Sequence, residues 1–179
     1  PGRQLRVLGK CAEVANNTAA MVDTPLLSAR NLTRYYHGRQ VLHEIDLEVQ
    51  RGEVLGFLGV NGAGKSTTMN ILCGVLAAHG GQVTICGHDL VREPLQAKRH
   101  IGYLPEVPPL YVDATVDEFL TYCGRLRGLS ATRSAIALKK AKKDCDLDEV
   151  GSRLIGNLSK GFRQRVGVAQ ALLHEPAVV

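Results

Sequence analysis

Hydrophobic and polar positions follow two different periods along this chain. In the first part, Leu26–Tyr36 and Ile45–Val49 have the composition and alternation of strands, the second half-buried. The short apolar run Val54–Leu58 is typical of a buried strand, and Thr68–Leu76 is apolar at helical spacing. A glycine-rich segment separates these last two, so a strand, a loop and a helix are expected in succession.

Helical patterns dominate from Thr115 onward. Val116, Phe119 and Leu120 recur at helical spacing, and acidic Asp117 and Glu118 fall in the first turn, where a helix dipole favours them. The chain is therefore expected to begin with strands, to pass through a helical region and to return toward a sheet. The other expected elements are strands at 82–86 and 101–106, helices at 93–100, at 130–143 and from Ser159, a short helix near Leu147 and Val150, and the opening of a buried strand at 177–179.

Composition limits the class of protein. The chain has 179 residues, 45% of them hydrophobic, which is enough for one globular domain. The net charge of +5 is mild, and the densest basic run, at 139–143, is interpreted as a solvated helix face, so no nucleic acid partner is expected. No apolar run approaches the length of a transmembrane helix. The five cysteines are far apart and predict neither a disulfide framework nor a zinc site: Cys11, Cys73, Cys86, Cys123 and Cys145.

The segment Gly59–Thr67 carries the strongest chemical signal. It matches G-x-x-x-x-G-K-[ST], the phosphate-binding P-loop, without a mismatch. Its glycines allow successive N–H groups to point into one concavity, and the helix start adds further N–H groups. Lys65 is expected to bind the β- and γ-phosphates, and the Ser66 hydroxyl to ligate Mg²⁺. The alternative is a glycine-rich turn that binds nothing. The predicted nucleotide-binding residues of this loop are Gly59, Asn61, Gly62, Ala63, Gly64, Lys65, Ser66 and Thr67.

A second motif, Asn157–Arg165, allows a family to be named. Its core L-S-K-G-F-R-Q is similar to the signature loop LSGGQ, and Gly102–Glu106 is similar to the Q-loop region. Together with Tyr36 and the P-loop, which is the Walker A loop, these landmarks stand in the order found in the ATP-binding cassette of ABC transporters. The resemblance covers Met21–Val179. It is closest to the single-cassette ATPases of bacterial ABC-2 type exporters, gliding-motility-like ones included.

The resemblance implies roles for three further sites. Tyr36, or Tyr35 as the fallback, stacks on adenine through its π-face. Ser159 and Gly161 begin a helix that faces the γ-phosphate held by a second protomer. Glu106 stands at the glutamine position, near Mg²⁺ and the attacking water. The catalytic residues are then Lys65, Glu106 and Ser159, and the metal ligands Ser66 and Glu106. The alternatives are an ordinary strand-end tyrosine at Tyr36 and a plain helix cap at Ser159.

The sequence also departs from the family pattern. Glu106 replaces glutamine, and Lys160 and Phe162 replace glycine and glutamine in the signature. The Walker B Asp, the catalytic Glu, the D-loop and the H-loop His are absent; His174 precedes the Walker B position. The resemblance thus implies a C-terminally incomplete cassette that does not itself turn over ATP. Residues 1–20, without periodicity, are expected to be an artefact or upstream sequence outside the domain, with Met21 as the natural start. The alternative is a short basic arm that is disordered in isolation.

Residues 21–179 are therefore expected to form a partial ABC ATPase domain. Its fold is α/β, with a P-loop NTPase core, an antiparallel β-subdomain and a helical subdomain at about 107–165. The full protein is expected to hydrolyse MgATP in a head-to-tail dimer and to drive export through a transmembrane permease, at the cytoplasmic face of the inner (plasma) membrane. The transported substrate is chosen by a different chain. The alternatives are a soluble ABC ATPase that acts on ribosomes or DNA, and a nucleotide-binding module without hydrolysis.

Overall fold

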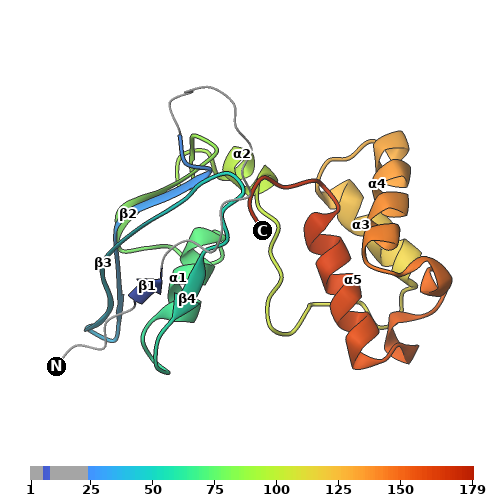
Figure 1. Cartoon of the computed structure of the whole chain (residues 1–179), viewed down its shortest axis with the longest axis horizontal. Coiled ribbons are helices and arrows are strands. Elements are labelled where there is room, and N and C mark those ends of the chain that lie inside the picture. The colour runs from blue at the N-terminus through green and yellow to red at the C-terminus, as the bar shows by residue number, and fades with distance from the viewer. Residues whose placement is uncertain (1–5, 9–23) are drawn as a thin grey trace. The chain divides into compact units, whose positions relative to one another are not determined.

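The structure is a computed structural model that describes residues 6–8 and 24–179 (Figure 1). The chain divides into two compact units, a first unit up to Lys98 and a second unit Arg99–Val179. The first unit holds the strands, and the second is built mainly of helices.

The first unit is organised around a four-stranded sheet in the order β3-β2-β5-β6, with every pair antiparallel. Buried Ala29, Leu32 and Ile85 form its centre. A two-residue turn joins β2 to β3, with positive φ at His37 (47°) and Gly38 (76°), as tight hairpins require. The predicted antiparallel β-subdomain is thus present. Its strands are β2 (Leu27–Tyr36), β3 (Arg39–Val49), β5 (Gly80–Ile85) and β6 (His88–Asp89).

The strand before the P-loop differs from the prediction. Only Gly56–Leu58 forms a strand, β4, which pairs antiparallel with β1 (Arg6–Leu8) in a separate two-stranded sheet. Val54 is 72% exposed and Leu58 is 56% exposed, so the expectation of a buried strand at 54–58 is wrong. An apolar run is buried only where other elements cover its faces, and in the described part of the chain β1 alone pairs with β4. Helix α1 (Lys65–Leu72) follows, as predicted.

Of residues 1–20, expected to lie outside the domain, only the three residues of β1 belong to the described part. The rest of that segment lies outside the described residues.

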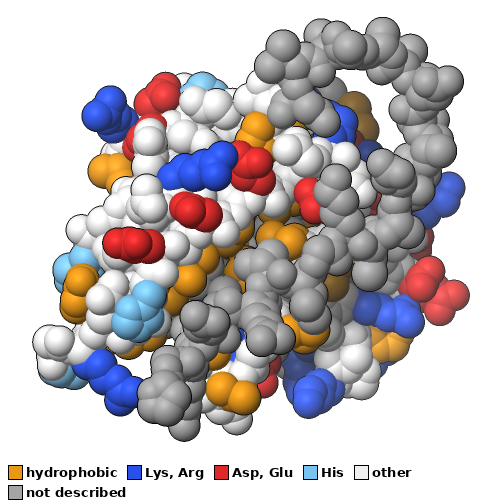
Figure 2. All heavy atoms as spheres, turned by 60° about the vertical axis from the view of Figure 1, so that its left-hand side comes forward, with side chains coloured by type: hydrophobic (Ala, Val, Ile, Leu, Met, Phe, Trp, Pro, Cys, Tyr) orange, Lys and Arg blue, Asp and Glu red, His pale blue; other side chains and the backbone are white. Residues whose placement is uncertain are grey.

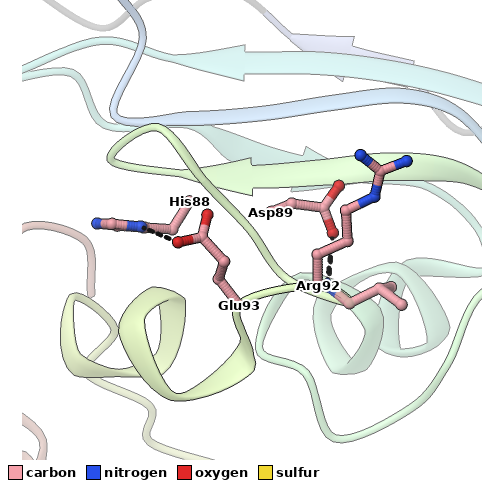
Figure 3. Close-up of polar contacts among 5 residues, drawn as sticks. His88, Asp89, Arg92 and Glu93 are labelled. Atoms are coloured by element: carbon pink, nitrogen blue, oxygen red, sulfur yellow. Dashed lines mark hydrogen bonds and ion pairs between the residues drawn. The ribbon is translucent and has the colours of Figure 1, made fainter.

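A carboxylate closes the turn after β6 (Figure 3). Asp89 Oδ1 accepts hydrogen bonds from the backbone N–H groups of Val91 and Arg92, both at 2.9 Å, and Oδ2 accepts one from Gln82 Nε2 at 2.7 Å. These donors, the Arg92 N–H foremost, hold the pKa of Asp89 below its usual value. The turn leads into α2 (Pro94–Arg99), and the arrangement is that of a structural cap rather than a ligand site.

The second unit packs three helices around one apolar core. Thr115 and Glu118 form a capping box at the first, and Ser130 and Ser159 cap the other two. Phe119, Leu120 and Val166 lie in the core, all less than 5% exposed. The predicted helical region is therefore present. Its elements are α3 (Val116–Leu126), α4 (Ala131–Asp144), the 3₁₀ turns η1 (Asp148–Val150) and η2 (Ile155–Asn157), and α5 (Lys160–Leu172).

Two predicted strands in the second unit are not formed. Residues 101–106 and 177–179 contribute only one isolated parallel bridge, between Ile101 and Val178. Ala177 and Val179 are exposed, so 177–179 does not begin a buried strand here. Apolar composition at both segments favoured strands, but a strand also needs a continuous partner, and the described residues supply only this bridge.

On the face shown in Figure 2, basic and acidic side chains are interspersed. None of the helices in the described part of the chain has the length and apolarity needed to cross a bilayer. The described cysteines, at 73, 86, 123 and 145, are all free thiols, while Cys11 lies outside the described residues.

Candidate nucleotide-binding site

The P-loop connects β4 to α1 through two left-handed glycines. Gly62 has φ 81° and Gly64 has φ 94°, a conformation that L-residues with a side chain rarely adopt. The Ala63 N–H donates to the Val60 carbonyl at 3.1 Å, which closes a turn, and the Thr68 N–H donates to the Gly64 carbonyl at 2.8 Å, the first bond of α1. The backbone of this segment thus bends sharply just before the start of a helix.

The Lys65 side chain folds back over this loop. Its Nζ donates hydrogen bonds to the carbonyls of Gly59, at 2.6 Å, and Val60, at 3.0 Å. A cation is thereby held against the backbone that begins the loop, next to the helix start. Such an ammonium is a compact point charge suited to phosphate oxygens.

The start of α1 presents an electropositive end. Gly64 is its N-cap and makes no side-chain capping bond, and no acidic residue lies in the first turn. The N–H groups of that turn have no partner inside the helix, so they and the helix dipole favour an anion. Buried Thr68 anchors the turn from within, its Oγ1 donating to the Gly64 carbonyl at 3.0 Å.

Packing against β3 fixes the position of the loop. A β-carbon on Gly64 would lie 2.6 Å from Leu42 Cδ2 and 3.3 Å from the Val41 carbonyl oxygen. Sequence reasoning identified neither Leu42 nor Thr68. Thr68 could have been noticed as a polar residue on the apolar side of the P-loop helix, whereas the contact of Leu42 is long-range and leaves no local pattern.

The metal ligands predicted from the sequence, Ser66 and Glu106, belong to different units of the chain. Ser66 is exposed in the first turn of α1. Mg²⁺ in phosphate sites commonly takes only one or two protein ligands and completes its shell with phosphate oxygens and water. No cluster of three or more His, Cys, Asp or Glu side chains suited to a metal occurs among the described residues. Glu106 is exposed and belongs to the second unit.

The two adjacent tyrosines at the end of β2 have different neighbours. The Tyr36 ring is 40% exposed, and the Arg34 guanidinium carbon lies 5.0 Å from its centroid. The Tyr35 ring meets His79 edge-on at 5.7 Å, and the Tyr35 N–H donates to His79 Nδ1. The Tyr36 ring therefore has one face against the Arg34 guanidinium. Tyr35 instead contacts His79, in the segment between α1 and β5.

The signature segment forms an exposed helix start. Ser159 is the N-cap of α5, and its Oγ accepts from the Phe162 N–H at 3.3 Å. Ser159, Lys160 and Gly161 are all exposed, while Leu158 anchors the segment in the core. A β-carbon on Gly161 would meet nothing nearer than 3.9 Å, so the surface at this residue is open. No acidic residue lies in the first turn.

The predicted site residues fall into two groups. The P-loop and Tyr36 belong to the first unit, and Glu106, Ser159 and Gly161 belong to the second. His174 has a structural contact in the second unit: its Nε2 lies 3.0 Å from the Ile101 carbonyl oxygen.

Comparison with known proteins identifies the family. Residues 42–179 match the profile of the family described as ABC transporter. The chain belongs to this family. It is 37% identical over 151 residues to an uncharacterised ABC transporter ATP-binding protein, YxlF, of Bacillus subtilis, covering 84% of this chain and 50% of that protein. It is 35% identical over 153 residues to the Nod factor export ATP-binding protein I of Cupriavidus metallidurans, covering 86% and 50%.

A solved structure of an ABC transporter's ATP-binding subunit has the same fold. Its TM-score is 0.75 at 32% identity, and the match covers 84% of this chain and 63% of that one. The α/β fold predicted from the P-loop and the signature is thus confirmed. The chain spans about half the length of these curated relatives.

One departure from the ABC transporter signature has a structural account. Phe162, at a position where the family has glutamine, lies with its ring 5.4 Å from the Arg165 guanidinium carbon. Arg165 in turn lies 3.4 Å from Asp146. The aromatic ring is thus part of a contact between α5 and the segment before η1. Lys160, the other replacement, is exposed and adds a cation to the helix start.

Proposed function

We propose that this chain binds MgATP through Gly59–Thr67 and forms the nucleotide-binding part of an ABC exporter. One observation carries the proposal: Lys65 Nζ is bonded to the Gly59 and Val60 carbonyls beside a helix start that has no acidic residue. A cation, unpaired N–H groups and a helix dipole converge there on one small region. This combination suits the triphosphate of a nucleotide.

Each part of the P-loop has a separate task. The loop N–H groups and the start of α1 hold the phosphates, and Lys65 neutralises charge on the β- and γ-phosphates. Ser66 would be one of the residues that hold Mg²⁺, which supplies charge neutralisation for the phosphates when it is bound. Tyr36 stacks on the base through its ring. Glu106, from the second unit, is assigned to the water that attacks the γ-phosphate.

The signature segment is assigned to a second copy of the cassette. Ser159 and Gly161 are exposed at an electropositive helix start, which is the arrangement needed to receive a phosphate from outside the chain. Closure of two protomers on MgATP, and reopening after hydrolysis, would move a transmembrane permease at the cytoplasmic face of the membrane.

The names of the relatives support export as the direction of transport. One relative is named for Nod factor export, and another, from Escherichia coli, is named as a probable multidrug ABC transporter protein. These names describe those proteins. The substrate of the present protein would be selected by a different chain, the transmembrane permease.

The proposal predicts that binding depends on the triphosphate. In competition against a fluorescent ATP analogue in the presence of Mg²⁺, ATP and inorganic tripolyphosphate are expected to displace the probe, and AMP is expected to displace it far more weakly. Binding is the chosen readout because it does not require turnover. If AMP competes as well as ATP, the P-loop is not the main binding determinant and the proposal is wrong.

A further inference from the structure

Arg34 and Tyr36 form a stacked pair at the end of β2. They are two residues apart on one strand, next to an irregularity in its pairing with β3. The guanidinium carbon lies 5.0 Å from the ring centroid, within the range of a cation–π contact. A planar guanidinium can lie against an aromatic face and leave the opposite face open.

The Arg34 side chain is fixed at its other side. Its Nη1 donates to the Ala77 carbonyl at 2.7 Å, in the segment between α1 and β5. Its Nε is buried and has no hydrogen-bond partner among the described residues. The guanidinium is therefore packed within the first unit, and it provides a fixed surface for the partly exposed Tyr36 ring.

The strand register connects this pair to the P-loop. Arg34 is the cross-strand partner of Leu42 on β3, at a position with a register irregularity on either side. Leu42 is the residue whose Cδ2 lies against Gly64. The hairpin segment that carries Arg34 and Tyr36 is thus the one that packs on the nucleotide loop.

We propose that Arg34 is a positioning residue for the nucleotide base. It covers one face of the Tyr36 ring and holds the ring in place, so that the opposite face receives a purine. The inference rests on the proposed function and extends it, because it assigns to Arg34 an effect on base binding without contact to the phosphates. Tyr35 does not share this arrangement, since its ring packs on His79.

Two ligands separate this role from a general loss of structure. Arg34→Ala is expected to weaken MgATP binding roughly two- to fivefold, the range of a partly exposed cation–π contact. Its affinity for magnesium tripolyphosphate, which has no base, should not change. Arg34→Lys keeps a cation and is expected to recover part of the loss. The matched control is Arg30→Ala on the same strand, where the exposed guanidinium pairs with Glu48; it should change neither affinity.

A double-mutant cycle tests the connection to Tyr36. In a Tyr36→Ala background, Arg34→Ala should have no further effect on MgATP, because the ring through which it acts is gone. Equal weakening of ATP and tripolyphosphate by both Arg34→Ala and Arg34→Lys would overturn the proposal, as would a full effect of Arg34→Ala in the Tyr36→Ala background. The Lys65→Ala variant distinguishes the two ways of failing. If it binds MgATP as tightly as the wild type, the proposed function itself is wrong. If it binds MgATP more weakly while either of these two contradicting Arg34 results is found, only the inference about Arg34 is wrong.

Discussion

The Cδ2 atom of Leu42 lies 2.6 Å from the point where a β-carbon on Gly64 would stand. Leu42 is 1% exposed on β3, and Gly64, with φ 94°, begins the P-loop helix. A strand of the antiparallel sheet and the phosphate loop are therefore in a contact that only glycine permits. The shape of the loop depends on this packing as well as on its own glycines.

Gly64→Ala is expected to destabilise the fold by roughly 2–4 kcal/mol, since it combines a clash with strain at a left-handed residue. Chemical denaturation measures this. Gly38→Ala is the matched control, because Gly38 also has positive φ (76°) but a β-carbon there would meet nothing within 4 Å. The control should cost only about 1 kcal/mol of backbone strain. Equal losses in the two variants would mean that the Leu42 contact imposes no constraint.

Substitution of Ser159 can separate its capping role from a role in assembly. Aspartate also caps helices, so Ser159→Asp should keep the unfolding free energy of the wild type, whereas Ser159→Ala should lose about 1 kcal/mol. If the segment faces a phosphate of a second protomer, Ser159→Asp and Ser159→Arg should both prevent MgATP-dependent dimerisation, by charge repulsion and by steric clash. Light scattering with and without MgATP measures the dimer. An ATP-dependent dimer of Ser159→Asp as stable as that of the wild type would contradict the assignment.

Local patterns predicted most of the elements, because their causes lie within a few residues. The acidic residues Asp117 and Glu118 indicated the start of α3, and Ser159 marked the start of α5, both of which the structure contains. The P-loop was predicted from glycine spacing, and its left-handed Gly62 and Gly64 are the physical reason for that spacing.

The features that sequence reasoning missed depend on partners far along the chain. The apolar run 54–58 predicted a buried strand, but burial requires covering elements, and Val54 is 72% exposed. The contacts of Leu42 with Gly64, and of Arg34 with Ala77, join segments that have no common periodicity.

Stability is expected to depend on pH through His174. Burial, and then the charge of Arg127, lower the pKa of His174, and its Nδ1 is buried without a hydrogen-bond partner among the described residues. Below pH of about 6.5 the unfolded chain therefore binds a proton that the folded His174 does not. Its contribution to stability is present above that pH and is lost as the pH falls toward the folded pKa.

The measurement is the free energy of unfolding at pH 7.5 and pH 5.5 for the wild type and for His174→Gln. The amide of glutamine can still donate to the Ile101 carbonyl but does not titrate. The wild type should lose more stability than the variant on acidification. An equal loss in both proteins would show that His174 contributes nothing to the pH dependence.

Calorimetric titration of MgATP into the wild type, Lys65→Ala and Lys139→Ala tests the central claim most directly. Lys139 is an exposed lysine on α4 with no assigned role and serves as the control for loss of one positive charge. The account predicts that Lys65→Ala weakens binding by about tenfold or more, because a charge-assisted contact to phosphate contributes about 1.5–3 kcal/mol. Lys139→Ala should bind as the wild type does. Equal affinity of Lys65→Ala and the wild type for MgATP would contradict the assignment of Gly59–Thr67 as the nucleotide site.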